Sequence, residues 1–430
     1  MAVLATLKQC VSRRRADHQL ALTAVLSLTH SLALDNLHKL ARSAGIQYKK
    51  VLAIAQVGLA FAQLTHHTDG VLMAQSLVIE AGWGYRLAKV HLSFREYFGV
   101  QAEAVNKQLL IPKLAASESI CVDDVVQYCK DFKLDTNYSL CLYLTCLLLP
   151  SSDSSNVIPF LKVRQRAEQV FLLIKPESLI STLEKVYEKT SPYDYEQLEF
   201  ILDELQLLSS SVDQLNRSLE SSVIEMERDK QILDCLKSYR RVSAASDEEL
   251  LWGDIVTHRL PLHALTSREK HWQTISPELN ADTVHLWIPM AATLRLPADS
   301  IYVTAVRNIV QSHVSQLPPE AQWSEHSVDS DFLDTVRGLL SHVTNMDLAV
   351  ACVSWVAREL PPGAEKVVVY SWCVSLQERH VASCSSQQRS QVMDVLEKHR
   401  SYSRQAAVEQ VATSSMRCVL SLSVSVSYSP

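Results

Sequence analysis

The sequence predicts an all-α protein, and more specifically an irregular α-solenoid of stacked helical hairpins. Glycine accounts for only 9 of the 430 residues, about 2% where an average chain carries about 7%. Because left-handed turns and close backbone contacts with a ligand need glycine, phosphate-binding loops and tight β-hairpins are not expected. Hydrophobic residues make up 47% of the chain and recur at helical spacing, in segments of about 12 to 20 residues separated by short polar breaks.

Helix signals begin near the N-terminus. Asp35 is predicted to cap a helix that ends at Gly45, and a second helix starts at Tyr48. The apolar stripes are Leu37, Leu40, Ala41 and Ala44 in the first helix, and Val51, Leu52, Ala55, Leu59 and Ala62 in the second. A later helix has the stripe Val163, Ala167, Val170, Phe171 and Ile174. Each spacing is that of one buried helix face.

Two further helix starts are predicted in the middle of the chain. Ser191 supplies a cap, Pro192 the first helical position and Asp194 an acid in the first turn. The buried face of that helix is predicted to be Leu198, Ile201, Leu202, Leu205 and Leu208. Ser246 and Glu249 form a capping box ahead of the next apolar residues.

Two elements are predicted in the C-terminal third. Asp299 opens a helix whose buried side is Ile301, Tyr302, Ala305, Val306, Ile309 and Val310. The continuous apolar run from Val367 to Leu376 suits a buried helix or a strand. We predict a helix, because nothing around this run offers a partner strand.

The solenoid segment is predicted to cover residues 1–415, and a serine-rich, disordered tail to cover 416–430. Breaks within the solenoid are predicted near 151–159, 209–222, 289–299 and 316–330. From Leu420 to Tyr428 apolar residues alternate with serine, which is a strand period after hundreds of helical residues. We expect this tail to lie outside the fold, as the mark of an early stop in the gene model or isoform; an ordinary frayed terminus is the alternative.

Charge and cysteine usage exclude several classes of protein. The net charge is −6, which gives no basic footprint for nucleic acid. The basic runs Arg13–Arg15 and Arg240–Arg241 are predicted to be solvated helix faces. The ten cysteines include no C-x-x-C pair, so we expect reduced thiols in the cytosol or nucleus and no zinc knuckle. The longest apolar run, Leu140 to Leu149, is too short for the ~20 residues of a membrane-spanning helix.

We predict no catalytic, cofactor-binding or metal-binding residues, because the sequence motifs of such sites are absent. His66 and His67 are adjacent, so their rings cannot face one metal from the same helix face. His258, His263 and His271 cluster in sequence and form the metal hypothesis that stays open. No cysteine or carboxylate lies at ligand spacing beside these three.

Two pairs of acids are interpreted as helix starts. Asp123 with Asp124, and Glu248 with Glu249, stand where negative charge complements the helix dipole. Catalysis by paired carboxylates is the weaker alternative at both places.

Two tryptophans are predicted to serve packing. Trp83 lies between Gly82 and Gly84, an arrangement that suits a bulky ring in a helix–helix crevice with close backbone approach. Trp272 precedes a proline-marked helix start and is interpreted as packing or as part of a partner surface.

An ordered set of segments resembles the C-terminal solenoid of the Rough deal, or kinetochore-associated protein 1, family over residues 20–350. The segments are Tyr48–Ile54, Ala81–Phe94, Tyr128–Asp135 leading into Leu140–Leu149, Glu269–Trp272 with Ser276–Leu279, and Ile301–Val303. None of them is a catalytic motif, and their order and spacing carry the resemblance.

The resemblance implies a non-enzymatic scaffold subunit of the kinetochore RZZ complex, acting in the spindle assembly checkpoint. The implied protein partners are the zeste-white-ten subunit, Zwilch, dynein through Spindly, and the Mad proteins; self-association is also implied. The implied location is the kinetochore and spindle in mitosis, and the cytoplasm or nucleus otherwise. Family members are several times longer and begin with a β-propeller that this sequence lacks, so Zwilch binding by the propeller is not carried over and a fragment or truncated product is expected.

Two alternatives remain at this point. One is a membrane-tethering subunit in Golgi-to-ER traffic, similar to the neuroblastoma-amplified family, which shares the zeste-white-ten partner. The other is a cytosolic hydrolase with an unrecognised site, which a pocket with convergent histidine, aspartate and serine side chains would favour.

Overall fold

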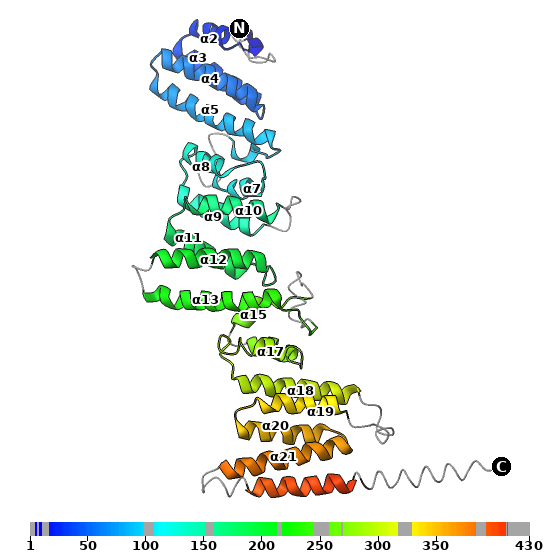
Figure 1. The fold of residues 1–430 in the computed structure, drawn as a ribbon. Helices are drawn as coiled ribbons and strands as arrows, with labels where there is room; N and C mark the ends of the chain where they lie inside the picture. The colour runs from blue at the N-terminus through cyan, green and yellow to red at the C-terminus, as the bar shows by residue number, and fades with distance from the viewer. Residues whose placement is uncertain are drawn as a thin grey trace, which may run out of the picture. The chain divides into compact units, whose positions relative to one another are not determined.

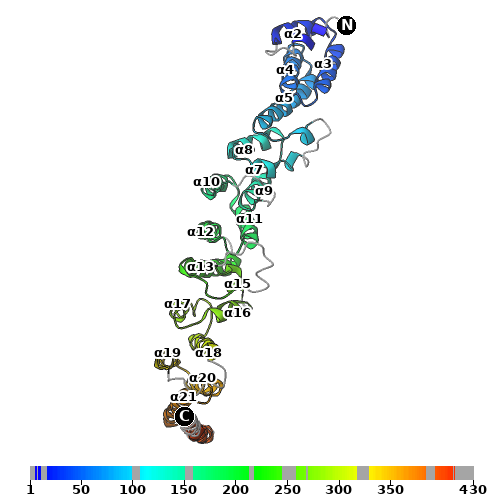
Figure 2. The ribbon, with the colours of Figure 1, turned by 90° about the vertical axis from the view of Figure 1, so that its right-hand side faces the viewer.

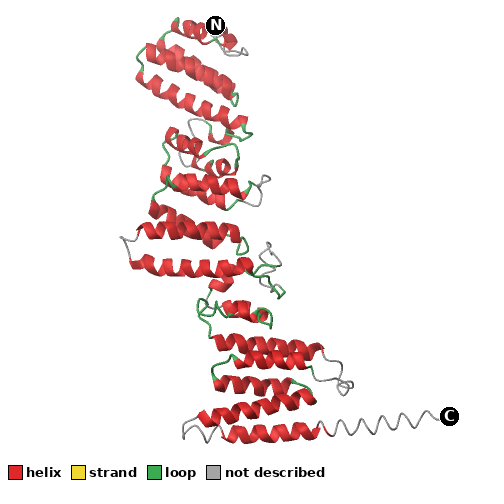
Figure 3. Ribbon diagram, in the orientation of Figure 1, coloured by secondary structure: helices red, strands yellow, loops and turns green. Residues whose placement is uncertain are grey.

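A computed structural model describes residues 5–6, 8–10, 17–98, 107–150, 158–212, 217–244, 258–267, 270–316, 329–383, 393–409 and 411. Within these ranges every regular element is an α- or 3₁₀-helix (Figure 3). The all-α prediction is therefore confirmed. Contacts divide the chain into two compact units, residues 1–190 with 203–212 and residues 191–202 with 213–430.

The first unit is a succession of helical hairpins (Figure 1). Its elements are α2 (His18–Leu26), α3 (His30–Ala44), α4 (Tyr48–Leu64), α5 (Thr68–Lys89), η1 (Arg95–Tyr97), α7 (Ile111–Ala116), α8 (Val122–Asp131), α9 (Thr136–Leu148), α10 (Phe160–Phe171) and α11 (Pro176–Lys189). Helix α4 packs against α2, α3 and α5, and helix α9 packs against α7, α8, α10 and α11. Helix α12 (Tyr195–Val212) is divided between the two units.

In the second unit the long helix α13 is followed by short elements and then by long hairpins (Figures 1 and 2). Its elements are α13 (Arg217–Ser238), α15 (Leu262–Thr266), α16 (His271–Ile275), η2 (Ser276–Glu278), α17 (Val284–Trp287), α18 (Ala298–Gln316), α19 (Ser330–Ser341), α20 (Met346–Glu359) and α21 (Ala364–Ser383). A further helical segment covers residues 393–409. The run from Val367 to Leu376 lies inside α21, so its prediction as a helix is confirmed.

The predicted apolar faces are largely buried. Leu37, Leu40 and Ala41 of α3 join Val51 and Phe61 of α4 in one core cluster of the first unit. In the second unit the buried faces of α18 to α21 form another cluster. The buried members of the predicted α12 and α18 faces are Leu198, Ile201, Leu202 and Leu205, and Ile301, Ala305, Val306 and Val310.

Three predicted helix starts differ from the structure. Helix α3 begins at His30 rather than at Asp35, because its amphipathic period extends back to the buried Ala33. Helix α12 begins at Tyr195, and Asp194 is its cap: the carboxylate accepts a hydrogen bond from the Gln197 amide at 3.1 Å.

Asp299 lies inside the first turn of α18, and its role is a contact between helices. Its carboxylate accepts hydrogen bonds from the backbone amides of Thr344 and Asn345, both at 2.9 Å. Asn345 in turn caps α20 through the Leu348 amide. The acid predicted to start one helix therefore fixes the start of another.

Several sequence predictions fall on residues outside the described ranges. These are the Ser246–Glu249 capping box, the basic run 13–15 and the 416–430 tail. Helices α12 and α13 extend through 209–212 and 217–222, inside one of the predicted breaks.

Helix ends in this glycine-poor chain use other residues in the left-handed conformation. His66, His91, Lys133 and Arg295 have φ values between +50° and +60°. The residue after each of them donates its backbone N–H to the carbonyl five positions earlier, as in a Schellman motif. An example is the bond from the Leu92 amide to the Leu87 carbonyl at 2.9 Å. Gly45 also has positive φ and ends α3 as predicted.

The glycines beside Trp83 have different surroundings. A methyl group added at Gly84 would lie 2.4 Å from the ring of Tyr48, whereas one added at Gly82 would meet nothing within 4 Å. The predicted close approach is confirmed at Gly84, where α5 packs on the first residue of α4.

We expect Gly84→Ala to destabilise the first unit by about 1–3 kcal/mol, the usual range for overpacking. Gly82→Ala is the matched control and should stabilise by up to about 1 kcal/mol, because alanine favours a helix interior. Urea unfolding followed by far-UV circular dichroism measures both. Equal effects of the two substitutions would contradict the packing of Gly84 on Tyr48.

Candidate functional site

The adjacent histidines His66 and His67 form the turn between α4 and α5. His66 occupies the left-handed position that ends α4. The Nδ1 atom of His67 accepts a hydrogen bond from the Gly70 amide at 2.9 Å and so caps α5. Both residues therefore stabilise the boundary between two helices.

The three histidines of the metal hypothesis lie around α15 and α16. The His258 carbonyl accepts a hydrogen bond from the Arg241 amide at 3.1 Å. His271 Nδ1 lies 3.0 Å from the Ser267 carbonyl oxygen. Within the described ranges, no group of three or more histidine, cysteine, aspartate or glutamate residues is placed to hold a metal ion. That these histidines bind no metal stays a prediction.

The acids Asp123 and Asp124 lie in the first turn of α8, as predicted. Asp124 Oδ2 accepts a hydrogen bond from the Cys121 amide at 3.3 Å, which forms part of a capping box. Glu248 and Glu249 lie outside the described ranges.

Trp83 is a packing anchor, as predicted. Its side chain is nearly buried, with the residue 3% exposed. The indole N–H donates a hydrogen bond to Asp131 Oδ2 at 2.7 Å, and the ring meets Tyr128 edge-on at 5.1 Å between centroids. The contacts join α5 to α8.

Trp272, the other tryptophan singled out in the sequence, is half-buried in α16.

A buried ion pair lies near this anchor. Lys107 Nζ is 2.5 Å from Glu80 Oε1, and the same ammonium group lies 4.4 Å from the centre of the Phe132 ring. The Tyr128 hydroxyl donates a hydrogen bond to the Lys107 carbonyl at 2.8 Å. Every charged atom in this set has a partner within the fold, so the pair holds the hairpins together.

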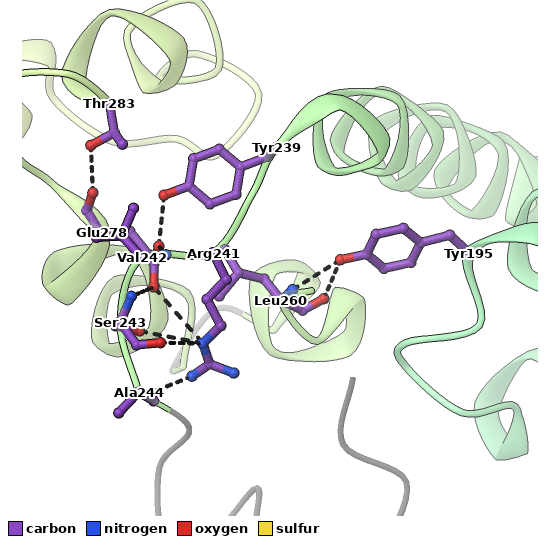
Figure 4. A network of polar contacts seen from close by, with 9 residues as sticks. All are labelled: Tyr195, Tyr239, Arg241, Val242, Ser243, Ala244, Leu260, Glu278 and Thr283. Atoms are coloured by element: carbon purple, nitrogen blue, oxygen red, sulfur yellow. Dashed lines mark hydrogen bonds and ion pairs between the residues drawn. The ribbon is translucent and has the colours of Figure 1, made fainter. Parts of the chain in front are cut away.

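The second unit contains a buried carboxylate that sequence reasoning missed (Figure 4). Glu278 is fully buried and accepts hydrogen bonds from the Tyr239 hydroxyl at 2.6 Å and from the amides of Val242 and Ser243 at 2.8 and 3.0 Å. Arg241 Nε lies 3.9 Å from the Glu278 carboxylate, and the Arg241 side chain is only 4% exposed. The prediction that the Arg240–Arg241 run is solvated is wrong for Arg241, because this carboxylate holds it inside.

The same region is tied to α12. The Tyr195 hydroxyl donates to the Leu260 carbonyl at 2.5 Å and accepts from the Leu260 amide at 3.0 Å (Figure 4). Burial raises the pKa values of Tyr195 and Tyr239, so both phenols stay protonated and donate. These bonds fix irregular backbone that has no helical partner of its own.

A second buried cluster contains a serine, a cysteine and a histidine. Ser354 Oγ lies 3.1 Å from His399 Nε2, and Cys373 Sγ lies 3.2 Å from His399 Nδ1. Gln377 Oε1 is 2.8 Å from the same Nδ1, and because this oxygen can only accept a hydrogen bond, the ring proton lies on Nδ1. The cluster joins α20, α21 and the helical segment 393–409.

The chemistry of this cluster is that of a structural contact rather than of a nucleophile. Ser354 stands inside α20 and donates to the Val350 carbonyl at 2.7 Å, and the backbone amides around it belong to the helix, so they cannot form an oxyanion hole. Burial raises the pKa of Cys373 and lowers that of His399. A neutral thiol and a neutral imidazole do not form the activated pair that nucleophilic catalysis needs.

We expect His399 to make the stability of the second unit depend on pH. Its pKa is lowered by burial and then by the charge of Arg358. Below pH ~6.5 the unfolded chain takes up a proton that the folded one resists, so stability falls as the pH falls. Between pH 7.5 and 5.5, His399→Gln should lose about 1 kcal/mol less than the parent in urea unfolding. If the parent and His399→Gln lose the same free energy of unfolding between these two pH values, the prediction is wrong.

Large apolar side chains are exposed near two turns of the first unit. They are Leu26 and Leu32 beside the α2–α3 turn, and Leu64, Leu72 and Met73 beside the α4–α5 turn. Both turns lie at the same end of the hairpins, because a methyl group at Gly70 of α5 would lie 3.3 Å from Leu34 of α3. Clustered exposed apolar residues are typical of protein-binding surfaces.

None of the helices in the described ranges is both long enough and apolar enough to cross a membrane.

Two known proteins are similar to most of this chain. Kinetochore-associated protein 1 of Mus musculus is 27% identical over 390 residues, 85% of this chain, and that of Homo sapiens is 26% identical over 428 residues, 93% of this chain. The family model of the KNTC1 third ARM-repeats domain matches residues 1–203, and that of the Rough deal protein C-terminal region matches residues 250–417. The chain is similar to the Rough deal family in both regions.

The two matched regions follow the structural division of the chain, since one lies mostly in the first unit and the other within the second. The resemblance of the sequence segments to the family is thereby confirmed. The chain spans less than a fifth of the length of the curated relatives, 17% of the mouse protein and 19% of the human one.

Proposed function

We propose that this chain is a non-enzymatic helical scaffold at the kinetochore. The observation that carries the proposal is the similarity to kinetochore-associated protein 1 over most of the chain. The resemblance extends the proposal to the RZZ complex, with the zeste-white-ten subunit, Zwilch, Spindly with dynein, and the Mad proteins as partners. The role proposed for that complex is to support the spindle assembly checkpoint.

Three features of the chain support a scaffold. Its units are built from helical hairpins with buried apolar cores, and buried polar contacts such as those of Trp83 and Glu278 join separate elements. Exposed apolar side chains such as Leu64 and Leu72 offer surface for protein partners. A scaffold of this kind binds through large interfaces in which a few anchors dominate.

The proposal is tested by the location of the tagged chain in mitotic cells. We expect signal at kinetochores in prometaphase, and co-purification of the zeste-white-ten and Zwilch subunits. Signal on ER membranes throughout the cell cycle would instead favour the membrane-tethering alternative and would overturn the proposal.

A second experiment tests the proposal that the chain acts only as a scaffold. Replacing His258, His263 and His271 together with alanine should leave partner recruitment nearly intact, provided circular dichroism shows a folded protein. Loss of recruitment or of a bound metal in a folded triple variant would contradict the scaffold-only role.

A further inference from the structure

A groove lies between α20, α21 and the helical segment 393–409, with a volume of about 720 Å³. We call it the α20 groove. One side is lined by residues of α20 at helical spacing, which are Asp347, Val350, Ala351, Ser354 and Arg358. The segment 393–409 lines it with Val395, His399 and Tyr402, and α21 with Tyr370, Gln377 and His380. Three helices thus border one depression.

One end of the groove offers hydrogen-bond donors that the described part of the chain does not use. Arg358 forms no ion pair or hydrogen bond there, unlike Arg400, which pairs with Glu378 at 2.9 Å. Tyr370 is only 7% exposed, yet its hydroxyl has no hydrogen-bond partner within the described ranges. The last turn of α20 favours a cation at Arg358 through the helix dipole, but the groove gives that cation no anion. Glu409, whose charge acts on Tyr370 from outside the groove lining, accepts a hydrogen bond from Gln405 at 3.0 Å.

The other end of the groove carries the opposite charge. The Asp347 carboxylate lies in the first turn of α20, is 82% exposed and is 3.6 Å from His380 Nδ1. Eleven residues separate Asp347 from Arg358, which is roughly 16 Å along a helix. Between them the exposed apolar atoms come from Val395 and Tyr402, which are 41% and 48% exposed. The groove is therefore acidic at one end, apolar in the middle and basic at the other end.

We propose that the α20 groove binds an amphipathic helix of a partner protein, with an acidic side chain against Arg358 and a basic side chain against Asp347. Apolar residues of that helix pack on Val395 and Tyr402. With its acid near its own N-terminus and its base near its C-terminus, the bound helix runs antiparallel to α20, so the charges also complement both helix dipoles. Binding of an amphipathic helix in an apolar groove is a recurrent mode of recognition. This inference does not depend on the kinetochore role.

A display library of 18-residue helical peptides, randomised on one face, tests the proposal against the full chain. We expect the enriched peptides to carry an acid and, about eleven residues toward the C-terminus, a base. In fluorescence anisotropy, Arg358→Glu should weaken their binding by roughly tenfold or more. Replacing the peptide acid with lysine should restore binding to Arg358→Glu and weaken binding to the parent chain.

The matched control is Arg404→Glu, because Arg404 is exposed on the same helical segment but does not line the groove. It should leave peptide binding unchanged. Tyr402→Ala tests the apolar part and should also weaken binding, and Arg358→Gln replaces Arg358→Glu if the reversal lowers the melting temperature. Failure to enrich any peptide, or equal binding to the parent and the Arg358 variants, would overturn the proposal.

Discussion

Replacing Glu278 with alanine is expected to destabilise the second unit by about 3–5 kcal/mol. The carboxylate is fully buried and satisfies the Tyr239 hydroxyl and the amides of Val242 and Ser243. Its removal leaves these donors without this acceptor and takes the Glu278 charge away from the buried Arg241 cation. Breaking a buried pair by removing one partner costs this much because a charge stays buried and uncompensated. Urea unfolding followed by circular dichroism measures the loss.

Two further variants identify the cause. Glu278→Gln keeps the volume and one acceptor oxygen, so it should cost less than Glu278→Ala but more than a surface change. Glu199→Gln is the control, because Glu199 pairs with Lys237 where both side chains are a third or more exposed, and such a pair contributes at most about 1 kcal/mol. If Glu278→Ala costs no more than Glu199→Gln, the carboxylate does not hold this region together.

The helices could be predicted because their signals are local. The α4, α12 and α18 faces follow from apolar residues three and four apart, and Gly45 marks the end of α3 within the same short window. The error at Asp35 arose because an aspartate inside an amphipathic helix resembles a cap, although the apolar residues before it, Leu32 to Leu34, belong to the same helix. The apolar spacing therefore shows that a helix is present more clearly than it shows the residue at which the helix begins.

The polar contacts could not be predicted because their partners are far apart in sequence. Trp83 and Asp131 are 48 residues apart, Tyr195 and Leu260 are 65, and Val242 and Glu278 are 36. Nothing within a window of one helix distinguishes Arg241, which is buried, from a solvated arginine. The α20 groove is likewise formed by three helical segments, of which only α21 was predicted from the sequence, through the run from Val367 to Leu376. The binding surface of a solenoid depends on residues that are far apart in sequence, whereas its helices depend on residues that are close in sequence.

Trp83→Ala is expected to destabilise the first unit by about 3–5 kcal/mol, the range for large aromatic truncations in a core. The indole lies between α5 and α8, against the Tyr128 ring. Its loss leaves a cavity in the contact that joins these hairpins and removes a donor from Asp131, which keeps a hydrogen bond from Gln127 at 2.7 Å. Circular dichroism in urea is the measurement, because other tryptophans dominate the fluorescence.

Trp83→Phe separates the two effects, since it keeps an aromatic ring but removes the N–H group. It should cost less than Trp83→Ala, and the part due to the Asp131 hydrogen bond should be about 0.5–1.5 kcal/mol. Trp272→Ala is the comparison for a half-buried ring in the other unit and should have a smaller effect than Trp83→Ala, because less apolar surface returns to water. A Trp83→Ala protein that unfolds at the urea concentration of the parent would show that the ring contributes nothing to the junction of α5 and α8. Trp83 would then be a candidate for partner binding instead, since an aromatic ring that does not stabilise its own fold is typical of an interface anchor.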